Sequence, residues 1–180
     1  MSTLGFGDIT FQSDLGRLFS IVVLVTGVIY LLVLLPFTFI QFFYAPWMRA
    51  QAAARAPREL PSSWRQHVIL TNYDAVASAL IPMLENYGHP YIVLCPTPAE
   101  ALALDERGVK SAVGDLDDPD TYRKMRIDRA AMLVSTRGDM VNANVTFTAR
   151  ELAPRLPIVA SADSDASQDV LELAGATLVL

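Results

Sequence analysis

The hydropathy pattern divides this chain of 180 residues into an apolar first part and a mixed second part. From Leu18 to Met48, 31 consecutive residues carry no formal charge. A helix of that length reaches about 46 Å, compared with about 30 Å of bilayer hydrocarbon. A helix buried in a soluble protein keeps a polar face, and a cleaved signal has a shorter apolar run behind a basic N-terminus, whereas Asp8 and Asp14 precede this one. The pattern therefore predicts one membrane-spanning helix over residues 17–48.

The second part, residues 64–180, alternates short β-rich apolar runs with stretches of helical period. The predicted strands are 67–71, 91–95, 109–113, 130–135, 157–161 and 177–180. The predicted helices are 75–87, 98–107, 119–125, 141–152 and 167–174. Strands separated by one helix each predict right-handed β–α–β units, so the expected class is α/β with a doubly wound parallel sheet of Rossmann-like type. Residues 49–63, which are small, polar and basic with two prolines, are predicted to form a linker.

Positive charge lies mainly after the apolar run. The downstream arginines are Arg49, Arg55, Arg58 and Arg65, whereas the only basic residue upstream is Arg17. Because positive residues stay on the cytoplasmic side, we expect a protein of the cell (inner) membrane with its C-terminal domain in the cytoplasm. The net charge of −5 comes from acidic residues of the second part, which argues against a nucleic-acid partner. The single cysteine, Cys95, excludes an internal disulfide and fits a reducing cytosol.

Two residues inside the apolar run affect the expected shape of the helix. Pro36 lacks a backbone N–H and predicts a local kink. Gly27 has two interpretations, which the sequence leaves open: a bending point of a pore-lining helix, or a position where a second helix packs closely.

The first 16 residues contain the run Thr-Leu-Gly-Phe-Gly-Asp at positions 3–8. Glycines permit the alternating backbone conformations that point successive carbonyls to one axis, where stacked oxygens replace the hydration shell of a potassium ion. Directly before a membrane span, this run resembles the selectivity filter of the potassium-channel superfamily, Thr-Val-Gly-Tyr-Gly-Asp. The filter segment is therefore predicted over residues 1–16, and its potassium-binding residues are Thr3, Leu4, Gly5, Phe6 and Gly7.

The second part resembles the regulator-of-potassium-conductance domain, also called TrkA-N-like, in three places. These are the first strand and turn (residues 67–77), the pair Gly114-Asp115 after the third strand, and residues 148–154 at the end of the fourth helix. A filter, an inner helix and this domain in that order are typical of ligand-gated prokaryotic potassium channels. The resemblance implies a homotetramer, assembled through pore and Rossmann domains in a lipid bilayer, that conducts potassium ions passively.

The nucleotide fingerprint of Rossmann domains is altered in this chain. Gly-x-Gly-x-x-Gly supplies a tight turn, close approach of the pyrophosphate and helix–strand contact, but its three glycine positions read Asn72, Asp74 and Ala77. Asp74 would place a carboxylate where the pyrophosphate belongs. Cys95 stands where an acidic residue usually binds the ribose, and Asp115 would line the remaining cleft. We therefore predict a degenerate site that binds no dinucleotide cofactor, in a sheet kept for assembly.

Other residue groups support a structural role better than a chemical one. The cluster Asp115, Asp117, Asp118 and Asp120 could bind calcium, but Asp118 is the expected cap of the helix that begins at Pro119. Arg137-Gly-Asp139 spells an adhesion tripeptide by chance, and Asp139 is expected to cap the next helix. The two histidines have no zinc-ligand spacing, and no catalytic constellation appears, so an enzyme is not predicted.

These observations favour a potassium channel subunit with a cytosolic regulatory or assembly domain. Two alternatives remain: a membrane-tethered nucleotide-sensing protein, and a structural Rossmann protein without conduction. A filter requires a pore helix and an outer membrane helix before it, so the chain is expected to be a fragment that does not conduct alone.

Overall fold

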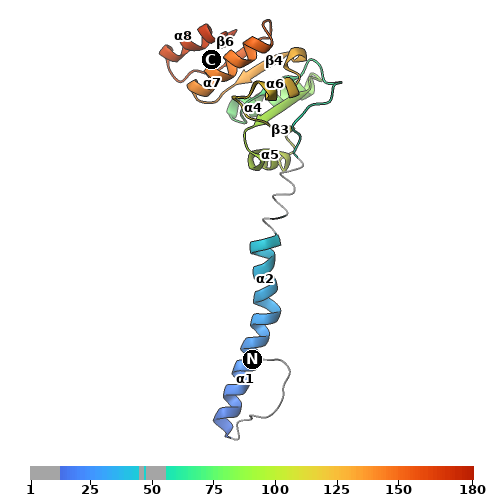
Figure 1. Cartoon of the computed structure of the whole chain (residues 1–180), viewed down its shortest axis with the longest axis vertical. Helices are drawn as coiled ribbons and strands as arrows, with labels where there is room; N and C mark the ends of the chain where they lie inside the picture. Colours follow the sequence, from blue (N-terminus) through green and yellow to red (C-terminus); the bar gives the residue numbers. More distant parts are fainter. Residues whose placement is uncertain (1–12, 45–46, 48–55) are drawn as a thin grey trace. The chain divides into compact units, whose positions relative to one another are not determined.

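The computed structural model describes residues 13–44, 47 and 56–180. The chain forms two compact units, Met1–Gln51 and Ala52–Leu180 (Figure 1). The predicted filter residues, Thr3 to Gly7, lie outside the described residues.

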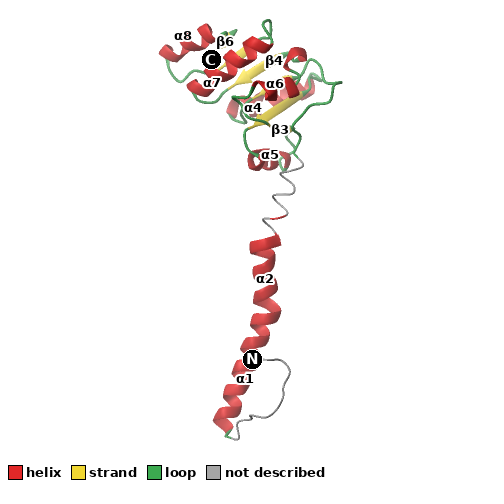
Figure 2. Ribbon diagram, in the orientation of Figure 1, coloured by secondary structure: helices red, strands yellow, loops and turns green. Residues whose placement is uncertain are grey.

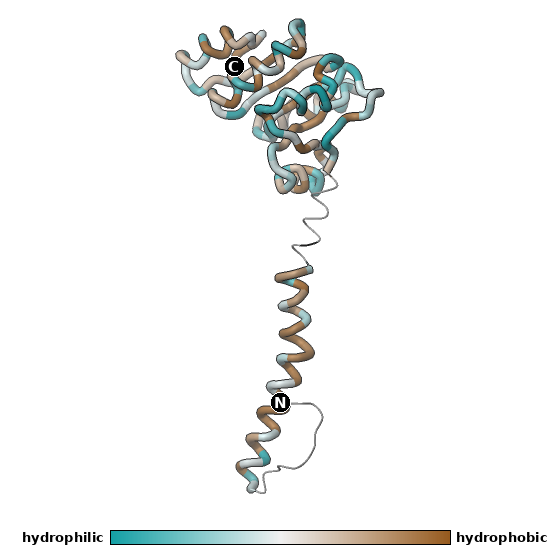
Figure 3. The backbone as a smooth tube through the Cα atoms, viewed as in Figure 1, coloured by the Kyte–Doolittle hydropathy of each residue, from teal (hydrophilic) through white to brown (hydrophobic). Residues whose placement is uncertain are grey.

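The described part of the first unit is one continuous helix of 31 residues, Asp14–Tyr44, with a mean hydropathy of 2.9. It comprises α1 (Asp14–Ile29), the π-helical turn η1 (Tyr30–Leu34), α2 (Leu35–Phe39) and the π-helical turn η2 (Ile40–Tyr44). Ser13 caps its start by accepting a hydrogen bond from the Gly16 N–H. None of its side chains is buried, and apolar residues predominate along it (Figure 3). By length and composition it can cross a membrane.

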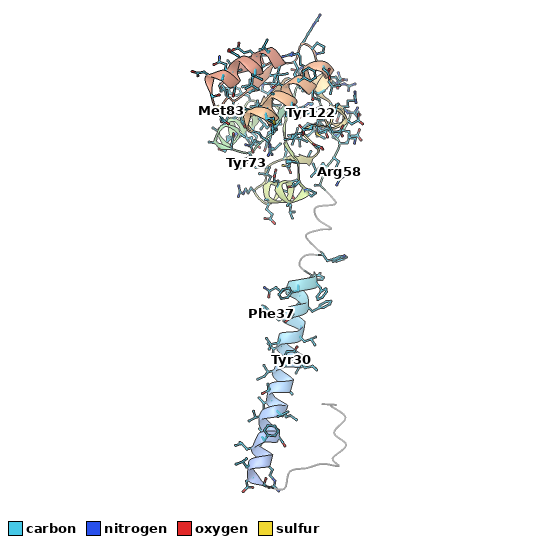
Figure 4. All side chains as sticks on the ribbon, turned by 60° about the vertical axis from the view of Figure 1, so that its left-hand side comes forward. Tyr30, Phe37, Arg58, Tyr73, Met83 and Tyr122 are labelled. Atoms are coloured by element: carbon cyan, nitrogen blue, oxygen red, sulfur yellow. The ribbon has the colours of Figure 1, made fainter. Side chains whose placement is uncertain are left out.

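Pro36 explains the wider turn in the middle of this helix. Proline donates no hydrogen bond, and its ring needs room near the carbonyl four residues earlier. In η1, the Leu35 N–H donates to the Tyr30 carbonyl five residues back. This wider spacing, directly before Pro36, is a common way for a helix to accommodate such a disturbance. Tyr30 and Phe37, on either side, extend away from the helix axis (Figure 4).

The second unit is built on a six-stranded parallel sheet with the order β3-β2-β1-β4-β5-β6. The strands are β1 (Val68–Leu70), β2 (Tyr91–Cys95), β3 (Ser111–Val113), β4 (Met132–Ser135), β5 (Ile158–Ala160) and β6 (Leu178–Val179). The helices are α4 (Ala75–Asn86), α5 (Pro98–Asp105), α6 (Pro119–Lys124), the 3-10 turn η3 (Ile127–Arg129), α7 (Asp139–Leu152) and α8 (Asp165–Ala174) (Figure 2). This is the doubly wound order, which confirms the predicted fold class.

Each face of the sheet has its own apolar core, because alternate strand residues point to opposite faces. In β1, Val68 and Leu70 pack with buried residues of α4 and α5, whereas Ile69 packs with buried residues of α6 and α7. The buried helix residues on the first face are Ala77, Ile81, Leu84, Ala101 and Leu104. Those on the second face are Tyr122, Val145 and Ala149.

Part of the segment predicted as a linker packs against the sheet domain. We call residues 56–66 the strap. The Val113 N–H of β3 donates to the Pro57 carbonyl at 2.8 Å, and the Leu60 N–H donates to the Lys124 carbonyl at 3.0 Å. Leu60 is only 4% exposed and belongs to the core on the α6–α7 face. The strap is therefore fastened to β3 and α6 before the chain enters β1.

Candidate functional site

The candidate site lies where the strand order reverses, between β1 and β4. In doubly wound sheets, ligands bind in the crevice at the carboxyl ends of the strands at this point. In this chain the crevice is bordered by the β1–α4 turn (71–74), the β4–α7 turn (136–138) and the start of α5.

Asp74 occupies the helix end that a pyrophosphate would use. It is the N-cap of α4, and its Oδ1 accepts a hydrogen bond from the Ala77 N–H at 2.9 Å. An anion bound at a helix N-terminus uses the same free N–H groups and the same end of the helix dipole. The half-buried carboxylate of Asp74 therefore fills the anion position.

Asn72, at the first fingerprint position, holds two turns together. Its Oδ1 accepts from the Tyr73 N–H at 3.0 Å, and its Nδ2 donates to the Thr136 carbonyl at 3.0 Å. The side chain thus links the turn after β1 to the turn after β4. Asn72 and Asp74 lie in the β1–α4 turn and Ala77 lies in the first turn of α4, and the side chains of Asn72 and Asp74 satisfy backbone groups there.

Arg137 crosses the crevice. It follows β4, its Nε donates to the Thr71 carbonyl at the end of β1 at 2.6 Å, and one terminal guanidinium nitrogen lies 3.3 Å from Oε2 of Glu100 in α5. The guanidinium therefore spans the carboxyl ends of three neighbouring strands. Sequence reasoning considered Arg137 only within its tripeptide and missed this role. One feature of the sequence could have indicated this role. Arg137 is a basic residue just after the fourth predicted strand, and the fingerprint glycines that usually bind the phosphates are absent.

A buried polar network holds the same strand ends in place. The hydroxyls of Thr71 and Ser135 lie 3.1 Å apart, and the Ser135 hydroxyl donates to Oδ1 of Asn142 at 2.7 Å. Nδ2 of Asn142 donates to the carbonyls of Arg137, at 2.6 Å, and Ser161, at 2.8 Å. All donors of the Asn142 amide are used, as a fully buried amide requires. Sequence reasoning missed Asn142. The feature that could have indicated it is its position, because it is a polar residue on the apolar face of its helix.

Cys95 and Arg137 both line a small cavity. The volume is about 230 Å³, and the lining residues are Asn72, Tyr73, Val93, Cys95, Glu100, Ala103, Leu104, Arg107 and Arg137. Sites for drug-sized ligands usually measure about 300–1,000 Å³. Burial raises the pKa of the Cys95 thiol to about 11, so it is neutral at pH 7 and offers no anionic acceptor to a ribose. Tyr73, labelled in Figure 4, belongs to the same wall.

Two of the acidic residues after β3, Asp115 and Asp118, satisfy backbone N–H groups of the loop and of α6. Asp118 is the N-cap of α6, as expected, and accepts from the Asp120 N–H at 2.9 Å. Oδ1 of Asp115 accepts from the Asp117 N–H at 3.0 Å. Asp115 and Asp118 line a separate cavity of about 310 Å³ together with Arg58 of the strap (Figure 4). Within residues 13–44, 47 and 56–180, no three His, Cys, Asp or Glu side chains form a group able to hold a metal ion.

Asp139 corrects one expectation. The N-cap of α7 is Gly138, and Asp139 is the first helical residue. Its carboxylate instead accepts a hydrogen bond from the Asp163 N–H at 2.9 Å. Hydrogen bonds from Ser167 and from the Asp163 backbone lower the pKa of Asp139, so this carboxylate ties the start of α7 to the loop after β5.

Two protein families match the chain. The TrkA-N domain family matches residues 68–180, and the ion channel family matches residues 1–44. Potassium channel protein 1 of Methanocaldococcus jannaschii is 27% identical over 183 residues, which cover 98% of this chain and 54% of that protein. Probable potassium channel protein 2 of the same organism is 27% identical over 195 residues, covering 100% and 53%. The chain thus spans about half the length of the curated relatives it matches.

Solved structures of the GsuK channel share the fold. The structure described as GsuK bound to NAD is 37% identical with a TM-score of 0.67, and the match covers 99% of this chain and 32% of that chain. The structure described as GsuK bound to ADP is 37% identical with a TM-score of 0.68, covering 99% and 47%. These similarities agree with the resemblance to potassium channels that carry a TrkA-N-like domain.

Proposed function

The chain belongs to the TrkA-N domain family, and on that premise we propose that it is a subunit of a tetrameric potassium channel with a cytosolic regulatory domain. The single observation that carries the proposal is the order of its parts. An ion-channel match over residues 1–44 comes first and contains the whole 31-residue apolar helix, and the TrkA-N domain follows. The potassium channel relatives match the chain over nearly its whole length, which supports the same order.

In the proposed channel, four copies contribute the carbonyls of residues 3–7 to one axis, where they replace the water around a potassium ion. The apolar helix of each copy lines the pore below this filter. Gly27 lies within this helix, and an added Cβ there would meet no described residue beyond its own helical backbone. Permeation is passive, so the chain performs no catalysis.

We propose further that the nucleotide site of the domain is degenerate, so that NAD and ADP bind weakly in the usual pose. The capping carboxylate of Asp74 supports this, because a pyrophosphate on α4 would lie beside it. Two like charges about 4 Å apart repel by about 4 kcal/mol at an effective dielectric constant near 20. That corresponds to nearly three decades of affinity. The neutral Cys95 thiol removes the acidic partner of the ribose as well.

Growth of a potassium-uptake-deficient bacterium on low potassium tests the channel proposal. The complete gene should restore growth, and Gly5→Ala should abolish it, because a Cβ disfavours the backbone geometry that points the carbonyls inward. Glu106→Gln is the control, since Glu106 is exposed and lies outside both the proposed filter and the wall of the crevice cavity. Undiminished growth of Gly5→Ala at equal membrane expression would contradict the filter assignment.

A membrane-tethered nucleotide sensor is the second candidate, favoured by the similarity to structures described as bound to NAD and ADP. It predicts nucleotide binding without potassium uptake. The growth assay separates the two, because a sensor without a pore restores no growth at any expression level.

A further inference from the structure

We infer that the ion pair between Arg137 and Glu100 is a latch across the crevice, and that a nucleoside diphosphate enters when its phosphate replaces Glu100 as the partner of Arg137. The inference rests on the proposed regulatory domain with its altered nucleotide site. The ion pair keeps that site closed, and the guanidinium of Arg137 is the group that receives the phosphate.

The two ends of the Arg137 side chain are held unequally. Nε donates to the Thr71 carbonyl at 2.6 Å, which fixes the base of the guanidinium at the end of β1. The terminal nitrogen lies 3.3 Å from Glu100 Oε2, longer than the roughly 2.7–2.9 Å of a strong charge-assisted hydrogen bond. The Glu100 side chain is 47% exposed, and exposed ion pairs contribute little stability. Glu100 is therefore the exchangeable partner, and Arg137 stays in place.

The charges around the crevice leave Arg137 as the group suited to a phosphate. The N-terminus of α4, the usual seat, is filled by the Asp74 carboxylate. A guanidinium presents paired N–H donors that match two phosphate oxygens, so it can take over this role. Arg107 lines the same cavity and forms no hydrogen bond or ion pair through its side chain to any other described residue, which adds positive charge to the wall.

The size of the cavity agrees with a closed state. Arg137 and Glu100 both belong to its wall, and its volume of about 230 Å³ is below the roughly 300 Å³ at which small-molecule sites begin. Separating the pair enlarges this space without moving the sheet. The buried network of Asn142 holds the backbone of Arg137 meanwhile, because Nδ2 of Asn142 donates to the Arg137 carbonyl at 2.6 Å.

Calorimetric titration of the full chain in detergent micelles with ADP tests the latch. Glu100→Gln keeps the size of the side chain and removes its charge, so we expect ADP to bind at least about tenfold more tightly than to the unmodified chain. The double variant Glu100→Gln with Arg137→Gln should lose the gain, because the phosphate then has no guanidinium. Glu106→Gln is the matched control, an exposed acid of the same segment outside the cavity wall, and should leave the affinity unchanged.

A second probe separates phosphate recognition from a general change in the cavity. Adenosine carries no phosphate, so its affinity should be the same for the unmodified chain and for Glu100→Gln. Unchanged ADP affinity in Glu100→Gln, or a gain that persists in the double variant, would overturn the latch. Micromolar ADP binding by the unmodified chain would refute the degenerate-site proposal instead, and the ratio between variants would still decide the latch.

Discussion

The indole ring of Trp64 meets the imidazole ring of His67 edge-on, with the ring centroids 5.7 Å apart. His67 is fully buried directly before β1, and its Nε2–H donates to the Met125 carbonyl at 2.9 Å. Its Nδ1 is buried without a hydrogen-bond partner among the described residues. Burial lowers the pKa of His67 from its ordinary value of 6.5, although the bond to Met125 and the charge of Asp128 oppose this. The neutral ring therefore joins the strap to the sheet.

The lowered pKa of His67 predicts a loss of stability in mild acid. Below about pH 6.5 the unfolded chain binds a proton that the folded domain resists, so stability is complete above this pH and declines as the pH falls toward the folded-state pKa. We expect the urea midpoint of the domain, followed by tryptophan fluorescence of the full chain in detergent, to fall between about pH 7 and pH 5. His67→Gln should flatten this decline. His89→Gln, a change at an exposed histidine, should not, and equal slopes for both variants would refute the assignment.

Replacements of Asp74 should separate its effect on stability, as a helix cap, from the effect of its negative charge on nucleotide binding. Asp74→Ala removes the acceptor for the Ala77 N–H and should cost about 1 kcal/mol of unfolding free energy. Asp74→Asn keeps an N-cap acceptor, so its urea midpoint should stay close to that of the unmodified chain. Asp74→Asn also removes the negative charge at the start of α4, so ADP should bind it more tightly. If the affinity for ADP is unchanged, the charge of Asp74 is not what weakens the site.

Gly114 should tolerate no side chain. A Cβ at this position would lie 2.4 Å from Cγ2 of Thr121 and 3.1 Å from Cδ1 of Leu94, and Thr121 is itself buried in α6. Gly114→Ala should therefore lower the unfolding free energy by about 1–3 kcal/mol, as in other overpacked cores. Adding Thr121→Ser removes Cγ2 and should restore part of this loss. A double variant no more stable than Gly114→Ala would show that the contact with Thr121 is not the cause.

The arginines after the apolar helix predict the orientation of the chain. Because Arg49, Arg55, Arg58 and Arg65 follow the helix, the domain should lie in the cytoplasm. A fluorescent protein that matures only in the cytoplasm should be bright when fused after Leu180. A phosphatase that is active only in the periplasm should be silent at the same position. The reverse pattern would contradict both the orientation and the proposed regulatory role.

The regular elements of the domain could be predicted because each depends on local patterns. Apolar runs bounded by turn residues predicted the strands, and the right-handed crossover rule predicted their parallel arrangement. The latch could not be predicted in the same way. Its parts come from three separate segments, namely Thr71 directly after β1, Glu100 in α5 and Arg137 in the β4–α7 turn, and only the completed sheet brings them together. The carboxylate of Asp74 was predicted at the start of α4, because a helix N-terminus fixes the surroundings of its cap.

The polar network of Asn142 and the packing of the strap could not be predicted for the same reason, because both depend on contacts between segments distant in the sequence. Asn142 interrupts an apolar helix face, and its partners lie at the ends of β4 and β5, which the periodicity of one helix does not specify. The strap is rich in small, polar and proline residues, a composition that is typical of a flexible linker. Leu60 is a single apolar residue between polar and proline residues. It is buried because it packs into the apolar core on the α6–α7 face, which residues distant in the sequence form.

The strap also protects the outermost strand on its side of the sheet. An unpaired edge strand is a template for aggregation, and β3 would offer its outward N–H groups to strands of other molecules. The bond from the Val113 N–H to the Pro57 carbonyl occupies one of these groups, and the prolines of the strap cannot extend a β ladder. A soluble fragment that begins at Trp64 would leave this edge open and would associate, whereas one that begins before Pro57 would stay dispersed.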